Sequence, residues 1–245
     1  SKMSIIQKSW RDFLSPAMIA LNVLPVVFGI VFWAVILFYF SDNLLGFINR
    51  FFPISWQNQL LISDSFLTNI MKGTIYVILY AFLGFFVVVF ACVGNMFVSL
   101  FYTPLVVRYV YSKHYPTLPK PKGISLFDSL KAFFKMFVLF CAGLVVCIPF
   151  LFMPFVGAIV MLIPHFIFFY KATLFDVGTE ILGKQNYEHF MQEKNNKLQI
   201  AFAAYALGFI PVFNFFAPLL QILIFTHFCF ANQVLLESSE PDSKS

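Results

Sequence analysis

The feature that most constrains this chain is a set of four long stretches without a single Asp, Glu, Lys or Arg. They cover residues 13–41, 73–107, 136–170 and 198–236. A helix that rises 1.5 Å per residue needs about 20 residues to cross the ~30 Å of hydrocarbon in a bilayer. The first two stretches therefore predict one crossing each. The last two are too long for one helix and too short for two.

Prolines divide each of the last two stretches into arms that are shorter than a crossing. The prolines are Pro149 and Pro154 in one stretch and Pro211 and Pro218 in the other, and the arms cover 136–148, 154–170, 198–210 and 218–236. These arms correspond to roughly 20 to 28 Å of helix. We therefore predict two helical hairpins that dip into the membrane and return to the side they came from. Paired, interrupted apolar segments are the best sequence pointer to a translocation site.

The composition agrees with an integral membrane protein. Hydrophobic residues make up 60% of the chain and charged residues 11%, whereas soluble domains carry about a quarter charged residues. The expected fold is an all-α integral membrane protein with two transmembrane helices and two proline-broken, half-crossing helical hairpins. A single membrane domain is expected at 4–236, with a disordered tail at 237–245. Its segments are an amphipathic helix at 5–14, spanning helices at 16–41 and 73–112, and re-entrant hairpins at 129–172 and 196–236.

Basic residues predict the orientation in the membrane. The connection 108–135 holds six Lys or Arg residues and one acid, whereas 42–72 balances two bases against two acids. An excess of Lys and Arg marks the cytoplasmic side, so both termini and the 108–135 loop are expected inside. Anionic lipid headgroups explain the basic loop more simply than nucleic acid does. In the amphipathic helix, Lys8, Arg11 and Asp12 are expected to face water.

The two predicted hairpins also resemble each other in sequence. At an offset of 62 residues, Ile148-Pro149 aligns with Ile210-Pro211 and His165-Phe166 aligns with His227-Phe228. Eight of the 34 positions from 135 to 168 are identical to their counterparts. An internal duplication explains this pattern, and shared Phe-rich composition with coincidence is the alternative.

Several residues near the hairpin turns are candidates for an anion pathway. If the second arms begin at Pro154 and Pro218 inside the apolar layer, their free backbone N–H groups and helix dipoles favour an anion there. The alternative is that these prolines only shape the turns. Asn214 lies in the second turn, where it lines an ion route or caps the next helix.

Further candidates lie along the helices. His165 and His227 either bond neighbouring carbonyl groups or water, or act as pH-sensitive partners of an anion. Asn22 and Asn95 lie within the full spans and either join helices or contact substrate. Arg108 is the first charge after the second span, and serves as a membrane anchor or attracts anions.

No pattern in the sequence indicates an enzyme. A nucleophile with its base, a P-loop and a zinc signature are all absent from the sequence. No cofactor or metal is expected, because no acidic or thiol cluster accompanies the histidines. Every acid lies in a segment expected to be aqueous, which argues against a proton relay through membrane carboxylates.

Short motifs spread over residues 5–235 resemble those of one membrane protein family. They are Leu14-Ser15-Pro16, Leu24-Pro25, Tyr102-Thr103-Pro104, Ile148-Pro149, Phe175-Asp176 and, most specific, Ile210-Pro211-Val212-Phe213-Asn214-Phe215. On these motifs the chain resembles the CysZ family of bacterial sulfate permeases, which shares its domain with the etoposide-induced membrane proteins. The resemblance implies two spans, two half-crossing hairpins and a homo-oligomer in the bacterial inner membrane. It also implies passive transport of sulfate or a similar oxyanion.

Two departures from the family pattern bear on the substrate. Where the family carries two adjacent arginines used for sulfate, this sequence has Ile19 and Ala20, and Tyr111 stands where the family has Glu. The resemblance thus implies a permease or channel for a small oxyanion. A non-transporting membrane scaffold or assembly protein on the same fold is the alternative.

Overall fold

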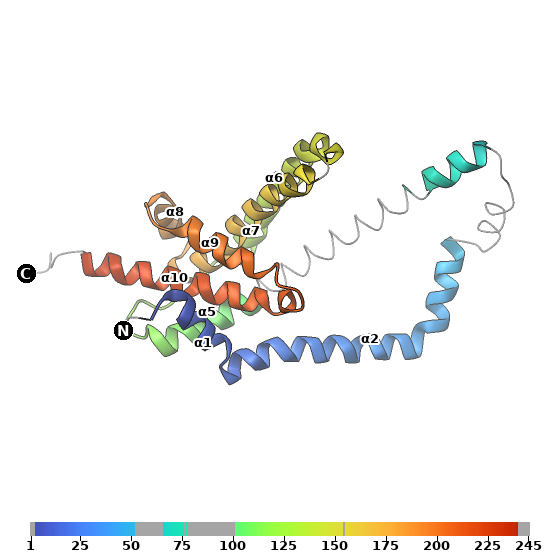
Figure 1. The fold of residues 1–245 in the computed structure, drawn as a ribbon. Coiled ribbons are helices and arrows are strands. Elements are labelled where there is room, and N and C mark those ends of the chain that lie inside the picture. The colour runs from blue at the N-terminus through green and yellow to red at the C-terminus, as the bar shows by residue number, and fades with distance from the viewer. Residues whose placement is uncertain (1–2, 52–65, 76, 78–100, 154, 240–245) are drawn as a thin grey trace, which may run out of the picture. The chain divides into compact units, whose positions relative to one another are not determined.

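A computed structural model describes residues 3–51, 66–75, 77, 101–153 and 155–239 (Figure 1). All regular structure within these ranges is helical, which confirms the all-α class. The chain divides into two compact units, Ser1–Ile19 with Phe97–Ser245, and Ala20–Met96. Each unit is described by itself.

The chain begins with the short amphipathic helix α1 (Ile5–Phe13). Its start is a capping box, in which Gln7 N donates to Ser4 Oγ at 3.2 Å and Ser4 N donates to Gln7 Oε1 at 3.0 Å. The prediction that Asp12 faces water is wrong, because its side chain is 0% exposed. Asp12 shares the buried face of α1 with Ser9 and Phe13, where polar partners described below compensate its burial.

The helix α2 (Pro16–Phe51) contains 36 residues. It extends ten residues beyond the predicted end at residue 41, so the start of the predicted 42–72 connection is helical. The predicted second span at 73–112 falls largely on residues 78–100, outside the described ranges. Its last part is α5 (Thr103–His114), which has Pro104 in its first turn.

The first predicted hairpin consists of α6 (Leu126–Cys147), the short 3-10 helix η2 (Ile148–Phe152) and α7 (Val156–Leu182). The two long helices lie side by side (Figure 1). A Cβ atom on Gly143 of α6 would lie 2.9 Å from Pro164 Cβ of α7, so glycine permits this close packing. Helix α7 continues past the predicted end at 172 and stops at Gly183, whose φ of 75° suits glycine.

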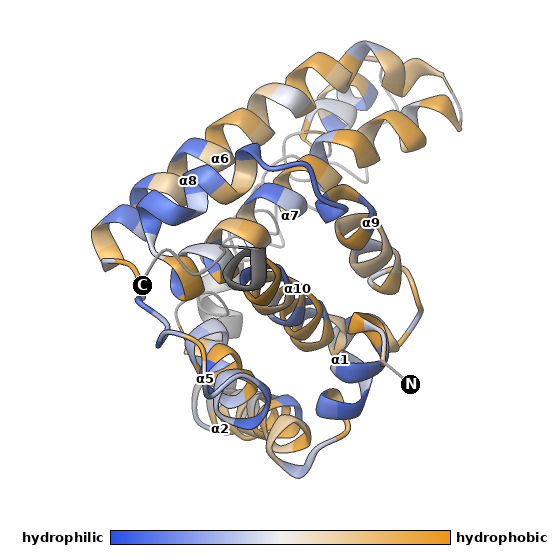
Figure 2. Cartoon of the chain, turned by 90° about the vertical axis from the view of Figure 1, so that its left-hand side faces the viewer, coloured by the Kyte–Doolittle hydropathy of each residue, from blue (hydrophilic) through white to orange (hydrophobic). Residues whose placement is uncertain are grey.

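The second predicted hairpin follows the polar helix α8 (Lys184–Gln192). It consists of α9 (Lys197–Leu207), a turn that contains η3 (Phe213–Phe215), and α10 (Ala217–Ser239). Helix α10 contacts α1, α5, α7 and α9 and lies among them (Figure 2). Its Leu223, Phe225, Phe228 and Phe230 are fully buried. The core of this unit is therefore built around α10.

Helix lengths bear on how the hairpins meet the membrane. In the described part of the chain, Leu126–Phe152, Val156–Leu182 and Ala217–Leu235 are long and apolar enough to span a bilayer. Helix α9 has 11 residues, which is about 16 Å and too short for a crossing. In the second hairpin α9 is thus shorter than a crossing, as predicted, whereas α10 is long enough to cross. The helices of the first hairpin are long enough to cross the membrane fully, and they can also form a re-entrant segment. Re-entrance remains a prediction for both hairpins.

Gly157 offers a test of the first hairpin turn. A Cβ atom there would lie 2.6 Å from the carbonyl oxygen of Phe150, a backbone atom that cannot move aside alone. We expect Gly157→Ala to lower the free energy of unfolding by about 1–3 kcal/mol, measured as a lower thermal unfolding midpoint in detergent. Gly73→Ala is the matched control, because nothing lies within 4 Å of its added methyl group. Equal midpoints for the two variants would contradict the packing described for this turn.

Candidate functional site

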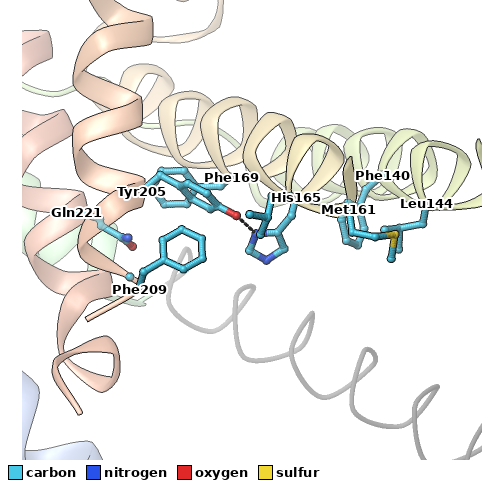
Figure 3. Close-up of a pocket in the computed structure, with 10 residues that line it drawn as sticks. Phe140, Leu144, Met161, His165, Phe169, Tyr205, Phe209 and Gln221 are labelled. Carbon is cyan, nitrogen blue, oxygen red and sulfur yellow. Dashed lines mark hydrogen bonds between the residues drawn. The ribbon is translucent and has the colours of Figure 1, made fainter. Parts of the chain in front are cut away.

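A pocket of about 410 Å³ lies where the two hairpins meet (Figure 3). Both arms of each hairpin contribute to its wall. The lining residues are Phe140 and Leu144 of α6, Met161, Leu162, His165 and Phe169 of α7, Tyr205 of α9, Gly208 and Phe209 of the second turn, and Gln221 of α10. Transporters built from repeated, interrupted segments place their substrate sites at this kind of contact.

Three polar side chains stand in this mostly apolar pocket. His165 Nδ1 lies 2.7 Å from Tyr205 Oη, and Gln221 Nε2 donates to the carbonyl oxygen of Ala204 at 3.0 Å. The rings of Phe140 and His165 meet edge to face at 6.2 Å. A few polar groups within apolar walls are typical of ligand pockets. Among the described residues that line the pocket there is no Asp, Glu, Lys or Arg, so a bound ion would meet neutral hydrogen-bonding groups of these residues.

The candidates from the second turn lie at the molecular surface of this chain. Asn214 is exposed in η3, and its backbone N–H donates to Ile210 O at 3.0 Å. Pro218 is exposed in the first turn of α10. Pro154 and Asn95 lie outside the described residues. The structure does not bring Asn214 or Pro218 into the pocket lining.

The other candidates, which were predicted in or next to the spanning helices, are not among the described residues that line the pocket. Arg108 is exposed on α5 and interacts electrostatically with Glu180 of α7. Asn22 is half-buried in α2 and belongs to the unit Ala20–Met96. Among the predicted site residues that the structure describes, His165 is thus the one that lines the pocket at the hairpin contact.

Both hairpin turns contain a strained residue directly after a proline. Phe155 has a φ of 64° and Val212 a φ of 65°, a region that costs a non-glycine residue about 1–3 kcal/mol. At Val212 the turn is closed by a bond from Phe213 N to Pro211 O at 2.7 Å, the i→i+2 pattern of a γ-turn. Both side chains are exposed. The turns are therefore tight reversals held by the helices on either side.

The other repeat histidine, His227, belongs to a separate buried cluster. Its Nε2 lies 2.8 Å from Asp12 Oδ2, and its Nδ1 lies 3.4 Å from Tyr115 Oη. His114 Nε2 lies 2.8 Å from the same Asp12 oxygen, and Lys113 Nζ lies 2.8 Å from Asp12 Oδ1. The side chains of Asp12 and His227 are 0% exposed. One carboxylate thus holds α1, α5 and α10 together.

Hydrogen bonding decides the charge state of this cluster. Asp12 lies on α1, before the first membrane-spanning helix. Burial by itself raises the pKa of its carboxyl group, but hydrogen bonds from Lys113, His114 and His227 outweigh burial and lower that pKa from the usual 3.8. The bond to Asp12 also raises the pKa of the Lys113 ammonium above its usual 10.5. Both groups are therefore charged at neutral pH and balance each other.

Sequence reasoning missed three of the polar residues that matter most here. For Asp12 the helical spacing was a signal, because it places Ser9, Asp12 and Phe13 on one face of α1. The structure shows that this face is buried. His114 and Tyr205 carried no signal, because their partners are distant in the sequence. The aligned histidines His165 and His227 each approach a tyrosine, Tyr205 and Tyr115 respectively, but in two different environments.

Long apolar helices paired into hairpins, with a pocket at their contact, define a helical membrane protein with several helices long enough to span the bilayer. Residues 5–218 match the family described as Sulfate transporter CysZ/Etoposide-induced protein 2.4, and the chain belongs to this family. The matched region ends at the start of α10, before His227. No curated protein and no solved structure matches the chain.

Asp12 gives a prediction with a defined pH dependence. Asp12→Asn should lower the free energy of unfolding at pH 7 by about 3 kcal/mol, because it leaves Lys113 and His227 without their charged partner. The folded-state pKa of Asp12 lies below 3.8, so its stabilisation is present above that pH and is lost as the pH falls through the folded value. Unfolding in detergent, followed from pH 7 to pH 3, should show the difference between wild type and variant narrowing in acid.

Asp128→Asn is the control for this experiment. Its carboxylate is partly exposed and lies 3.5 Å from the exposed Lys184, a kind of ion pair that contributes about 0–1 kcal/mol. An Asp12→Asn variant no less stable than Asp128→Asn would show that the cluster does not hold α1 in place.

Proposed function

We propose that this chain is a CysZ-like membrane permease or channel that carries a small oxyanion passively, with sulfate as the first expected substrate. The observation that carries the proposal is the pocket between two proline-broken hairpins, in a chain that belongs to the sulfate transporter family. Family membership supports transport in general. The ion and the passive mechanism are our proposal.

The pocket chemistry suits an anion that passes through without being held tightly. Tyr205 Oη and His165 Nδ1 share one hydrogen bond within apolar walls, which leaves one further donor, either the Tyr205 hydroxyl hydrogen or the His165 Nε2–H. Conduction requires binding that is weak enough for the ion to leave, and a pocket whose described lining carries no Lys or Arg meets this requirement. Positive charge is concentrated instead in the 108–135 connection, where it would raise the local concentration of anions.

The proposed arrangement in the membrane follows the charge distribution. Both termini and the 108–135 connection lie on the cytoplasmic side of the inner membrane, and this connection faces anionic lipid headgroups. The chain forms a homo-oligomer in the membrane, in which other copies or lipid cover the exposed apolar side chains of α6 and α7. Asn214 and the first residues of α10, including Pro218, then line the route at the second turn.

One observation favours a non-transporting scaffold as the second candidate. Tyr111, at the position of the family's Glu, donates its hydroxyl hydrogen to the carbonyl oxygen of Leu118 at 3.0 Å and thus holds the proline-rich connection. Ile19 and Ala20 supply no charge where the family has arginines. The family's two arginines are thus replaced by uncharged residues and its Glu by a tyrosine bonded within the chain, and a scaffold would need nothing more.

Sulfate flux distinguishes the two candidates. We expect purified protein in proteoliposomes to take up radiolabelled sulfate faster than empty vesicles do. His165→Leu should lower this flux roughly tenfold, since a hydrogen bond to a charged group contributes about 1.5–3 kcal/mol. His189→Leu is the matched control, because this histidine is exposed on α8.

The pattern of fluxes decides between the outcomes. Equal sulfate flux in loaded and empty vesicles would remove sulfate as a substrate. If phosphate, nitrate and thiosulfate also fail to cross, the scaffold becomes the better assignment.

Cysteine labelling tests the membrane arrangement. The background variant replaces the four native cysteines, Cys92, Cys141, Cys147 and Cys229, and a single cysteine then replaces Phe152 or Asn214. We expect a water-soluble maleimide added from the cytoplasmic side to label both positions in inverted vesicles, because re-entrant turns open toward the side their arms come from. Labelling only from outside would contradict the proposed topology.

A further inference from the structure

Asp12, His114 and His227 bring one carboxylate and two imidazoles together from α1, α5 and α10. Asp12 is 102 positions from His114 and 215 positions from His227 in the sequence, yet their ligand atoms all lie within 4.8 Å of one another. The Nε2 atoms of both histidines lie 2.8 Å from the same oxygen, Asp12 Oδ2. We propose that these three residues form a binding site for a divalent transition-metal ion such as Zn²⁺, which clips α1 to α5 and α10.

The donor set selects the class of metal. Two imidazole nitrogens and one carboxylate oxygen suit Zn²⁺ in a site that keeps one position open for water. Mg²⁺ and Ca²⁺ prefer oxygen donors and would find only one carboxylate here. The site lies apart from the pocket at the hairpin contact, because none of its three residues lines that pocket.

The groups around the cluster can support a bound ion. A histidine that gives its Nε2 lone pair to a metal carries its hydrogen on Nδ1, and such histidines normally donate that hydrogen to a neighbouring acceptor. Tyr115 Oη lies 3.4 Å from His227 Nδ1 and is placed to accept it. Asp12 and His227 are fully buried and held from several sides, whereas the side chain of His114 is 24% exposed. The ion therefore reaches the site from the side of His114.

Lys113 is the natural competitor of the ion. Its ammonium lies 2.8 Å from Asp12 Oδ1, and its side chain is 38% exposed. Without a metal, the carboxylate is balanced by this ammonium and accepts hydrogen bonds from both histidines. A bound dication would repel the ammonium, which has room to turn toward solvent because it is long, flexible and partly exposed. The metal thus takes the place that Lys113 holds in the cluster.

Zinc binding by the full chain tests the proposal. Protein without a polyhistidine tag is purified in detergent, treated with a chelator and titrated with Zn²⁺ by calorimetry and equilibrium dialysis. We expect one Zn²⁺ per chain and a higher thermal unfolding midpoint with zinc, because a ligand that binds only the folded state stabilises it. Bound Co²⁺ should give visible absorption bands typical of nitrogen and oxygen ligands.

Two variants separate a metal site from a simple hydrogen-bond network. His114→Gln retains an N–H donor for Asp12 but removes the imidazole, and should weaken zinc binding roughly 100-fold, since outer-shell partners alone contribute about 10–100-fold. Its unfolding midpoint without metal should stay close to that of wild type. Lys113→Met removes the competing cation and should strengthen zinc binding. His189→Gln, on the exposed face of α8, should change neither property.

Three results would overturn the assignment. They are the absence of stoichiometric zinc binding by the wild type, equal affinity of wild type and His114→Gln, and weaker binding by Lys113→Met. The last result would show that the lysine supports the cluster only through hydrogen bonding. None of these outcomes depends on sulfate flux, so a negative result for the metal site would not contradict the proposed transport function, and the reverse also holds.

Discussion

The structure of the larger unit depends on the enclosure of α10 by other helices. Polar side chains on a helix within the membrane are costly unless protein surrounds them. Helix α10 contacts α1, α5, α7 and α9, and four of its polar side chains have partners within the chain. Thr226 donates to Ile222 O, Asn232 donates to Phe228 O, Gln221 donates to Ala204 O, and His227 bonds Asp12. Because α10 is enclosed in this way, this apolar helix can carry Gln221 of the hairpin pocket and His227 of the Asp12 cluster.

The enclosure of α10 also explains why the two hairpins differ although their sequences align. The apolar window of α10 is 61% buried, whereas those of α6 and α7 are 6% and 17% buried. The first hairpin thus offers large apolar surfaces to lipid or to other copies, and the second fills the core. His165 and His227 consequently have different surroundings, one in an open pocket and one in a closed ionic cluster. An alignment of the repeats gives equivalent positions, but burial decides the chemistry of each histidine.

The sequence predicts much of the fold because hydrocarbon allows few alternatives. Lengths of charge-free segments and the positions of prolines indicate apolar helices and two hairpins, and the turns at Pro149 and Pro211 lie where those prolines predict them. The family was indicated separately, by the resemblance of short motifs. Asp12 could not be placed in this way, because a charged residue on an amphipathic helix normally faces water. Its burial follows from His114 and His227, and pairing across that distance in the sequence leaves no local pattern. The ends of α2 and α7 were also missed, since charged residues are good helix formers and do not stop a helix.

Neutralisation of Asp12 has a consequence for the proposed anion route. An unpaired carboxylate in a low-dielectric interior would repel anions over a long range, because the interaction of two charges there is screened far less than in water. Lys113 and the two histidines remove this repulsion at the cluster, and the described part of the pocket lining contains no acid. The electrostatic field along the hairpin contact therefore comes from neutral dipoles such as the Tyr205 hydroxyl and from the distant basic connection at 108–135. In such a field the proposed pathway would admit an oxyanion by size and hydrogen bonding rather than capture it by charge, and it would not need the family's arginine pair, in whose place this chain has Ile19 and Ala20.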